Sequence, residues 1–129
     1  MSTAKLTTAD EQIQPYIVRI TELDRLIHDP SRLALLTALE AYIPDALHFG
    51  SLQRLTGLSR GNISGHIGRL ERAGLVEIER RFVGKRPRTS VALTESGANG
   101  IEKHFKELRQ IRDGLEAIRE MEESRCPSK

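Results

Sequence analysis

An apolar stripe at helical spacing is the first regular pattern along the chain. Its positions are Ile13, Ile17, Ile20, Leu23 and Ile27. Apolar residues that recur every three or four positions share one face of a helix, so the stripe predicts an amphipathic helix over about 9–27. Pro15 falls inside the stripe, so the helix either begins near Pro15 or ends its first turn there. The polar residues 1–8 are expected to be disordered.

A second helix is predicted to begin directly after Asp29. The carboxylate can accept a hydrogen bond from an amide of the first helical turn, and Pro30 suits the first helical position because no amide hydrogen is needed there. Pro44 marks the end of this helix. Its apolar positions are Leu33, Leu36, Ala38 and Leu39.

A short third helix is predicted to start at Ser51 as its N-cap. Leu52 and Leu55 are expected to face inward. Gly57 then closes the helix, and a turn of two residues separates it from the next N-cap, Ser59. This spacing is typical of a helix-turn-helix, in which the second helix can enter a DNA groove.

The helix that begins after Ser59 has one apolar and one polar face. Its apolar positions are Ile63, Ile67, Leu70 and Ala73. Gly74 follows the last of them, where a left-handed C-cap needs glycine. The opposite face comprises Arg60, Gly61, Asn62, Ser64, Gly65, Gly68, Arg69 and Arg72. This face has no acidic residue, little bulk and several hydrogen-bond donors, so it suits the floor of a DNA groove.

A β-hairpin is predicted after Gly74, where apolar and polar residues alternate. The first strand includes Val76, Ile78 and Phe82. Residues 84–88, Gly-Lys-Arg-Pro-Arg, are predicted to form a basic turn, and 89–93 the second strand.

A long final helix is predicted after Thr94, its N-cap. Apolar residues recur along it close to a heptad pattern, at Ile101, Phe105, Leu108, Ile111, Leu115 and Ile118. Such a seam needs a partner, which is either the first helix or a second copy of the chain. The expected dimerisation residues are Ile13, Ile17, Ile20, Ile101, Phe105, Leu108, Leu115 and Ile118.

Together these elements predict a mainly α fold with a small β-hairpin. The order of elements is that of a winged helix-turn-helix with N- and C-terminal dimerisation helices. We expect one domain over residues 9–120 and a flexible tail over 121–129.

The net charge of +2 conceals a strongly basic central segment. Residues 54–88 hold nine Lys or Arg and three Asp or Glu, which gives +6, whereas 1–53 carry −3 and 89–129 carry −1. A local excess of cations on the helix at 59–73 and on the hairpin favours a polyanionic partner.

The remaining composition indicates a cytoplasmic protein that is not an enzyme. No apolar run is long enough to span a bilayer, no secretion signal precedes the domain, and the single cysteine, Cys126, fits a reducing compartment. Neither a catalytic constellation nor a phosphate-cradling glycine loop is present. Glu102, His104 and Glu107 are interpreted as a solvated helix face, so we expect neither a metal nor a cofactor.

Three segments carry a resemblance to a known family. They are LDRLIHDPSRLALL at 23–36, FGSLQRLTGLSRGNISGHIGRLERAGLV at 49–76 and KRPRTSVALTESG at 85–97. Together they resemble the compact winged helix-turn-helix transcriptional regulators of the MarR/ArsR-like superfamily. The resemblance implies a homodimer, acting as a repressor, that binds a palindromic operator in double-stranded DNA and has an unidentified effector if any.

The resemblance also implies which residues contact DNA. The helix at 59–73 would read bases in the major groove, and the basic hairpin would lie on the backbone or in the minor groove. The expected DNA-binding residues are Ser59, Arg60, Asn62, Ser64, Gly65, His66, Arg69, Arg80, Arg81, Lys85, Arg86 and Arg88.

Several of these residues have a second interpretation. Arg69 and Arg72 could be surface charges that pair with Glu71 or nearby acids. Asn62 could assist the helix cap, and His66 could be a half-buried packing residue. Gly61, Gly65 and Gly68 each weaken a helix by about 1 kcal/mol relative to Ala, which favours shape reading or close backbone approach over many base contacts. The alternative function is a protein-interaction module whose basic hairpin binds an acidic partner.

Overall fold

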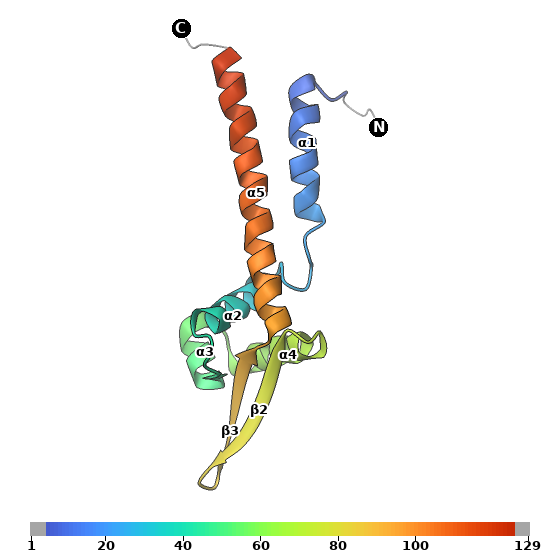
Figure 1. Cartoon of the computed structure of the whole chain (residues 1–129). Coiled ribbons are helices and arrows are strands. Elements are labelled where there is room, and N and C mark those ends of the chain that lie inside the picture. The colour runs from blue at the N-terminus through green and yellow to red at the C-terminus, as the bar shows by residue number, and fades with distance from the viewer. Residues whose placement is uncertain (1–4, 126–129) are drawn as a thin grey trace. The chain divides into compact units, whose positions relative to one another are not determined.

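The computed structural model describes residues 5–125. The chain divides into two compact units, Asp24–His104 and a second unit that combines Met1–Leu23 with Phe105–Lys129. The elements, in chain order, are α1 (Thr8–Thr21), α2 (Pro30–Ala41), β1 (Leu47–His48), α3 (Phe49–Thr56), α4 (Arg60–Arg72), β2 (Val76–Val83), β3 (Arg86–Leu93) and α5 (Glu95–Arg125) (Figure 1). Among the described residues no helix is long and apolar enough to cross a membrane.

The Asp24–His104 unit is a helical layer that packs on the base of a small sheet. The strand order is β1-β3-β2, with both pairs antiparallel. In Figure 1, α2, α3 and α4 gather near the base of β2 and β3, and the tip of this hairpin extends away from the helices. Fully buried side chains from all three helices and two strands form the core, among them Leu35, Leu36, Leu39, Leu52, Ile63, Ile67, Leu70, Val76 and Val91.

The other unit is a helix pair formed by α1 and the C-terminal part of α5, which lie side by side in Figure 1. A Cβ on Gly114 would collide with the Tyr16 ring, so the pair approaches closely where α5 has no side chain. Ile111 is buried in this unit. Nevertheless, α1 contains no fully buried residue, and Ile17 and Ile20 are 51% and 40% exposed.

The first helix begins within one residue of its predicted start but ends earlier than predicted. Thr7 and Asp10 form a capping box ahead of α1, so regular structure begins within the segment 1–8 and Pro15 lies inside the helix. The helix ends at Thr21 rather than near Ile27. Beyond it, the Asp24 carboxylate accepts a 2.9 Å hydrogen bond from the Leu26 amide, a local turn that competes with helix continuation.

The predicted caps of the middle helices are confirmed with one exception. Asp29 accepts from the Arg32 amide at 3.0 Å, and Gly57 ends α3 in the left-handed conformation, at φ +76°. The exception is Ser51, which lies inside α3 and accepts from Arg54, because that helix begins at Phe49. Leu55, expected to face inward, is 48% exposed.

The hairpin turn is shorter than predicted. Val83 pairs with Arg86, so only two residues form the turn, and the basic segment 86–88 belongs to β3. Pro87 is tolerated there because β1 pairs with β3 only at Ser90 and Val91, which leaves the other edge of β3 open at the tip. The sequence pattern also missed β1, which has only two residues.

The final helix is capped as predicted but is longer than expected. The Thr94 hydroxyl accepts from the Gly97 amide at 3.0 Å and donates to the Gly74 carbonyl at 2.6 Å. Helical structure continues to Arg125, past the predicted start of the tail at 121, and Cys126 lies outside the described residues. Ile101, expected in the dimer seam, is 0% exposed, so this chain alone already covers its side chain.

Candidate nucleic-acid interface

Helix α4 is held by local caps and by one fully buried face. Ser59 accepts from the Asn62 amide at 3.2 Å, so this serine serves as the N-cap. Ile63, Ile67 and Leu70 anchor the helix in the core. Gly74, at φ +78°, then turns the chain into β2. The rest of the helix surface is thereby fixed in an outward orientation.

Most of the predicted base-reading positions lie on this outward surface. The exposed members are Ser59, Arg60, Asn62, Ser64, Gly65 and Arg69. In residues 5–125 neither Arg69 nor Arg72 forms an ion pair, so the structure does not support their interpretation as paired surface charges. His66 differs from the others because it is half-buried and contacts Arg32 of α2.

The glycines of α4 are not required for packing within the chain. A Cβ placed on Gly61 or Gly65 would meet nothing within 4 Å, and one on Gly68 would meet only the flexible end of Arg72. Each glycine lowers helix stability by about 0.5–1 kcal/mol relative to Ala. The glycines therefore leave the α4 backbone uncovered. No contact within the chain accounts for the helix stability that they cost.

The hairpin β2–β3, here called the wing, places its basic residues along both strands. The exposed basic positions are Arg80, Arg81, Lys85, Arg86 and Arg88. Arg81 is bound by Glu79 in a two-point contact, with Nε–Oε1 at 2.7 Å and Nη2–Oε1 at 2.5 Å. The wing charges are thus not purely repulsive, since one arginine already has an acidic partner in the protein.

An open groove runs between α4 and the wing, and we call it the α4–wing groove. Two adjoining concavities form it, and both are lined by Phe49, Arg60 and Thr89. Arg60 lies over the Phe49 ring, with its guanidinium carbon 5.5 Å from the ring centroid. Such a cation–π contact restricts the arginine without neutralising it. The further basic residues of the groove are Arg54, Arg80 and Arg88.

Sequence reasoning missed two residues of this surface. Arg54 was counted in the basic segment but was not assigned to the site. The structure shows that Arg54 lines the α4–wing groove. Phe82 was predicted to lie in the first strand and was not assigned to the site, yet it is 76% exposed near the wing tip, opposite Pro87. The signal available in the sequence was a phenylalanine that directly follows Arg80 and Arg81, close to the predicted basic turn.

A metal centre is not indicated by the part of the chain that the structure describes. Within it, no group of three or more His, Cys, Asp or Glu side chains is arranged to hold a metal ion. The interpretation of His104 as part of a solvated helix face is wrong, because His104 is only 3% exposed and its Nε2 lies 3.1 Å from Nδ1 of His28. A pair of imidazoles is fewer than the ligands that a structural metal site requires.

The helix-turn-helix, the wing and the basic groove between them define a winged helix of the DNA-binding class. The chain belongs to the winged helix DNA-binding domain family, whose model matches residues 31–112. The resemblance expected from the sequence is therefore confirmed, and the protein is a DNA-binding transcriptional regulator rather than an enzyme. No curated protein matches the sequence significantly.

Solved structures support the same assignment. A transcriptional regulator homologue from Pyrococcus horikoshii is 29% identical, with a TM-score of 0.68 over 78% of this chain and 97% of the other. The PcaV transcriptional regulator from Streptomyces coelicolor, in complex with its natural ligand, is 24% identical, with a TM-score of 0.61 over 91% and 84%. A MarR-family regulator from Silicibacter pomeroyi is 22% identical, with a TM-score of 0.56 over 80% and 68%. The last two likenesses establish the shared fold.

Proposed function

We propose that the chain acts as a homodimeric repressor that binds a palindromic operator in double-stranded DNA. Helix α4 enters the major groove, and the wing contacts the adjacent backbone or minor groove. The observation that carries the proposal is the α4–wing groove, whose basic residues come from α3, from α4 and from the wing.

Charge and shape together favour a nucleic acid as the ligand of this groove. Arg54, Arg60 and Arg88 approach it from three different elements, and a phosphate backbone is the polyanion that such a distributed set matches. The open positions at Gly61 and Gly65 allow the α4 backbone to come close to base edges or sugars.

The wing tip adds an apolar contact to these charges. Phe82 and Pro87 are paired across the hairpin and exposed, with basic residues on both sides in sequence. Apolar side chains beside cations are used by minor-groove binders to contact sugars and base steps. We assign the wing tip to the minor groove on this basis.

Dimerisation is assigned to the helix pair of α1 and the C-terminal part of α5. Ile17 and Ile20 remain exposed on α1, and half-buried apolar side chains continue the surface. The half-buried residues are Ile13, Phe105, Leu108, Leu115 and Ile118. A second copy of the chain would bury this apolar surface in a symmetric dimer.

An effector molecule is consistent with the relatives but stays unidentified. The PcaV structure holds its natural ligand, and NadR, which has the same fold, was solved in complex with 4-hydroxyphenylacetate. Release of DNA by a small molecule is therefore a further element of the proposal.

The direct test is selection of bound DNA from random double-stranded oligonucleotides. The proposal predicts enrichment of an inverted repeat whose half-sites are separated by about one helical turn or a multiple of it. Enrichment of no sequence, or recovery of a nuclease-resistant complex with an acidic protein instead, would contradict it.

A further inference from the structure

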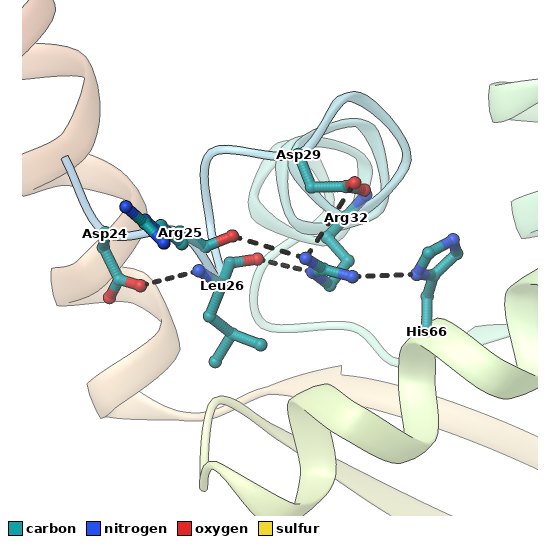
Figure 2. Close-up of polar contacts among 6 residues, drawn as sticks. All are labelled: Asp24, Arg25, Leu26, Asp29, Arg32 and His66. Atoms are coloured by element: carbon teal, nitrogen blue, oxygen red, sulfur yellow. Dashed lines mark hydrogen bonds and ion pairs between the residues drawn. The ribbon is translucent and has the colours of Figure 1, made fainter. Parts of the chain in front are cut away.

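Arg32 links the recognition helix to the segment that precedes α2. Its side chain is only 11% exposed. Nε donates to the Leu26 carbonyl at 2.6 Å, and Nη2 donates to the Arg25 carbonyl at 3.3 Å while lying 3.9 Å from the Asp29 carboxylate. Figure 2 shows the guanidinium enclosed by these groups, with its remaining terminal nitrogen directed at His66.

The contact with His66 determines which ring nitrogen carries the proton. Nη1 of Arg32 lies 3.3 Å from Nδ1 of His66. A guanidinium only donates hydrogen bonds, so Nδ1 must supply a lone pair. The proton of the neutral ring is then on Nε2, which points away from Arg32 in Figure 2.

We propose that Arg32 is a positioning residue that makes His66 a dedicated Nε2–H donor to DNA. This inference rests on the proposed function. Three contacts, to the Leu26 and Arg25 carbonyls and to the Asp29 carboxylate, fix the guanidinium of Arg32. The guanidinium in turn fixes the orientation and tautomer of the His66 imidazole. His66 therefore recognises a hydrogen-bond acceptor and cannot accept from a base amino group through Nε2.

Two kinds of DNA acceptor satisfy this chemistry. In the major groove the acceptors are N7 of either purine, O6 of guanine and O4 of thymine. The alternative is a phosphate oxygen, which would give affinity without sequence preference.

The tautomer is measured on the free protein by long-range ¹H–¹⁵N NMR of the imidazole rings, with His66→Gln used to assign the signals. The expected result is an unprotonated Nδ1 and a protonated Nε2 for His66, together with a shift toward a tautomer mixture in Arg32→Met, which offers Nδ1 no donor. A protonated Nδ1 in the wild-type protein would overturn the inference. Should Arg32→Met fail to fold, the wild-type spectrum alone decides.

The donor role is tested by comparing His66→Gln with His66→Asn on a selected operator. The glutamine amide reaches the Nε2 position and the asparagine amide does not, so Gln should retain binding and Asn should lose about three- to tenfold, the worth of one neutral hydrogen bond. Equal losses in the two variants would contradict the inference.

The source of the acceptor is identified with modified DNA. If a 7-deazapurine in the operator weakens binding by the wild-type protein but not binding by His66→Asn, the acceptor is a base N7. If a methylphosphonate has this effect instead, the acceptor is a phosphate oxygen. If neither modification nor replacement of the thymine or guanine carbonyl changes the difference between the two proteins, the donor role is wrong. Failure of the proposed function is separate, because it would appear as absent DNA binding while the NMR tautomer stayed readable.

Discussion

At the residue scale, the caps could be predicted and the long-range partners could not. Asp29, Ser59 and Thr94 each bond to an amide three residues further along the chain, so the information needed is local. The partner of His66 is 34 residues away, on another helix. Nothing in the local pattern distinguishes an exposed base reader from a side chain held by Arg32.

Asp29 provides a pH-dependent prediction. The hydrogen bond from the Arg32 amide lowers the pKa of the Asp29 carboxyl below its ordinary value, aided by the positive charge of Arg32 and opposed by partial burial. A lowered pKa in the folded state means that the charged carboxyl stabilises the fold above the unfolded-state pKa, near 3.8, and that this contribution is lost as the pH falls further.

Asp29→Ala is therefore expected to lower the free energy of unfolding by about 1 kcal/mol at neutral pH, because the N-cap is lost. The loss should be smaller at about pH 3 than at pH 7 by the linkage argument. Urea denaturation at both pH values measures it. Asp29→Asn is the control, since asparagine retains a cap without the titrating charge. An equal loss for Asp29→Ala at both pH values would refute the account.

At the element scale, helix existence was easier to predict than strand boundaries. The apolar pattern of α4 was sufficient to predict this helix. Three of its apolar residues are fully buried at the predicted spacing. The start of β3 depends instead on the pairing of Val83 with Arg86, and β1 exists only through its bonds to β3. A periodicity pattern contains no information about which strands pair when the strands are distant in sequence.

The exposed glycines of α4 make a prediction that separates stability from binding. Gly61→Ala together with Gly65→Ala should raise the free energy of unfolding by about 1–2 kcal/mol in total, since helix propensity improves and each added methyl group meets open space. The same variant should bind operator DNA more weakly, because the methyl groups hold the helix backbone away from the groove. Thermal denaturation and fluorescence anisotropy measure the two effects.

Asn99→Ala on α5 is the matched control for this variant. It also replaces an exposed helix residue with a better helix former, but outside the α4–wing groove. It should leave DNA affinity unchanged. If the α4 variant also binds operator DNA with unchanged affinity, the α4 backbone does not approach DNA closely at Gly61 and Gly65.

At the scale of the whole molecule, the division into two units revises the predicted dimer seam. Ile101 belongs to the core of the winged-helix unit, whereas Ile17 and Ile20 remain exposed on the helix pair. The heptad-like spacing in α5 was interpreted as one continuous seam, but the helix serves two different cores along its length. Spacing alone does not tell which core receives each apolar residue.

Ile17→Glu together with Ile20→Glu is expected to yield monomers. Two charges on the exposed apolar surface of α1 would have to be desolvated in a dimer, while in the monomer they stay in water. Sedimentation equilibrium measures the change in mass. Gln12→Glu together with Gln14→Glu, which adds the same charge at exposed polar positions of α1, should remain dimeric. Persistence of the dimer in the Ile17/Ile20 variant would assign the interface elsewhere.

The claim that the wing and α4 bind DNA is tested most directly by the salt dependence of binding. Fluorescence anisotropy of the full chain on a selected operator should show the logarithm of the association constant falling linearly with the logarithm of salt concentration. Arg86→Ala together with Arg88→Ala should weaken binding to all sequences and reduce this slope by about one unit per lost phosphate contact. Lys106→Ala together with Arg109→Ala, an equal loss of charge on α5, should leave the slope unchanged. Binding without any salt dependence, or equal slopes for both variants, would contradict the account.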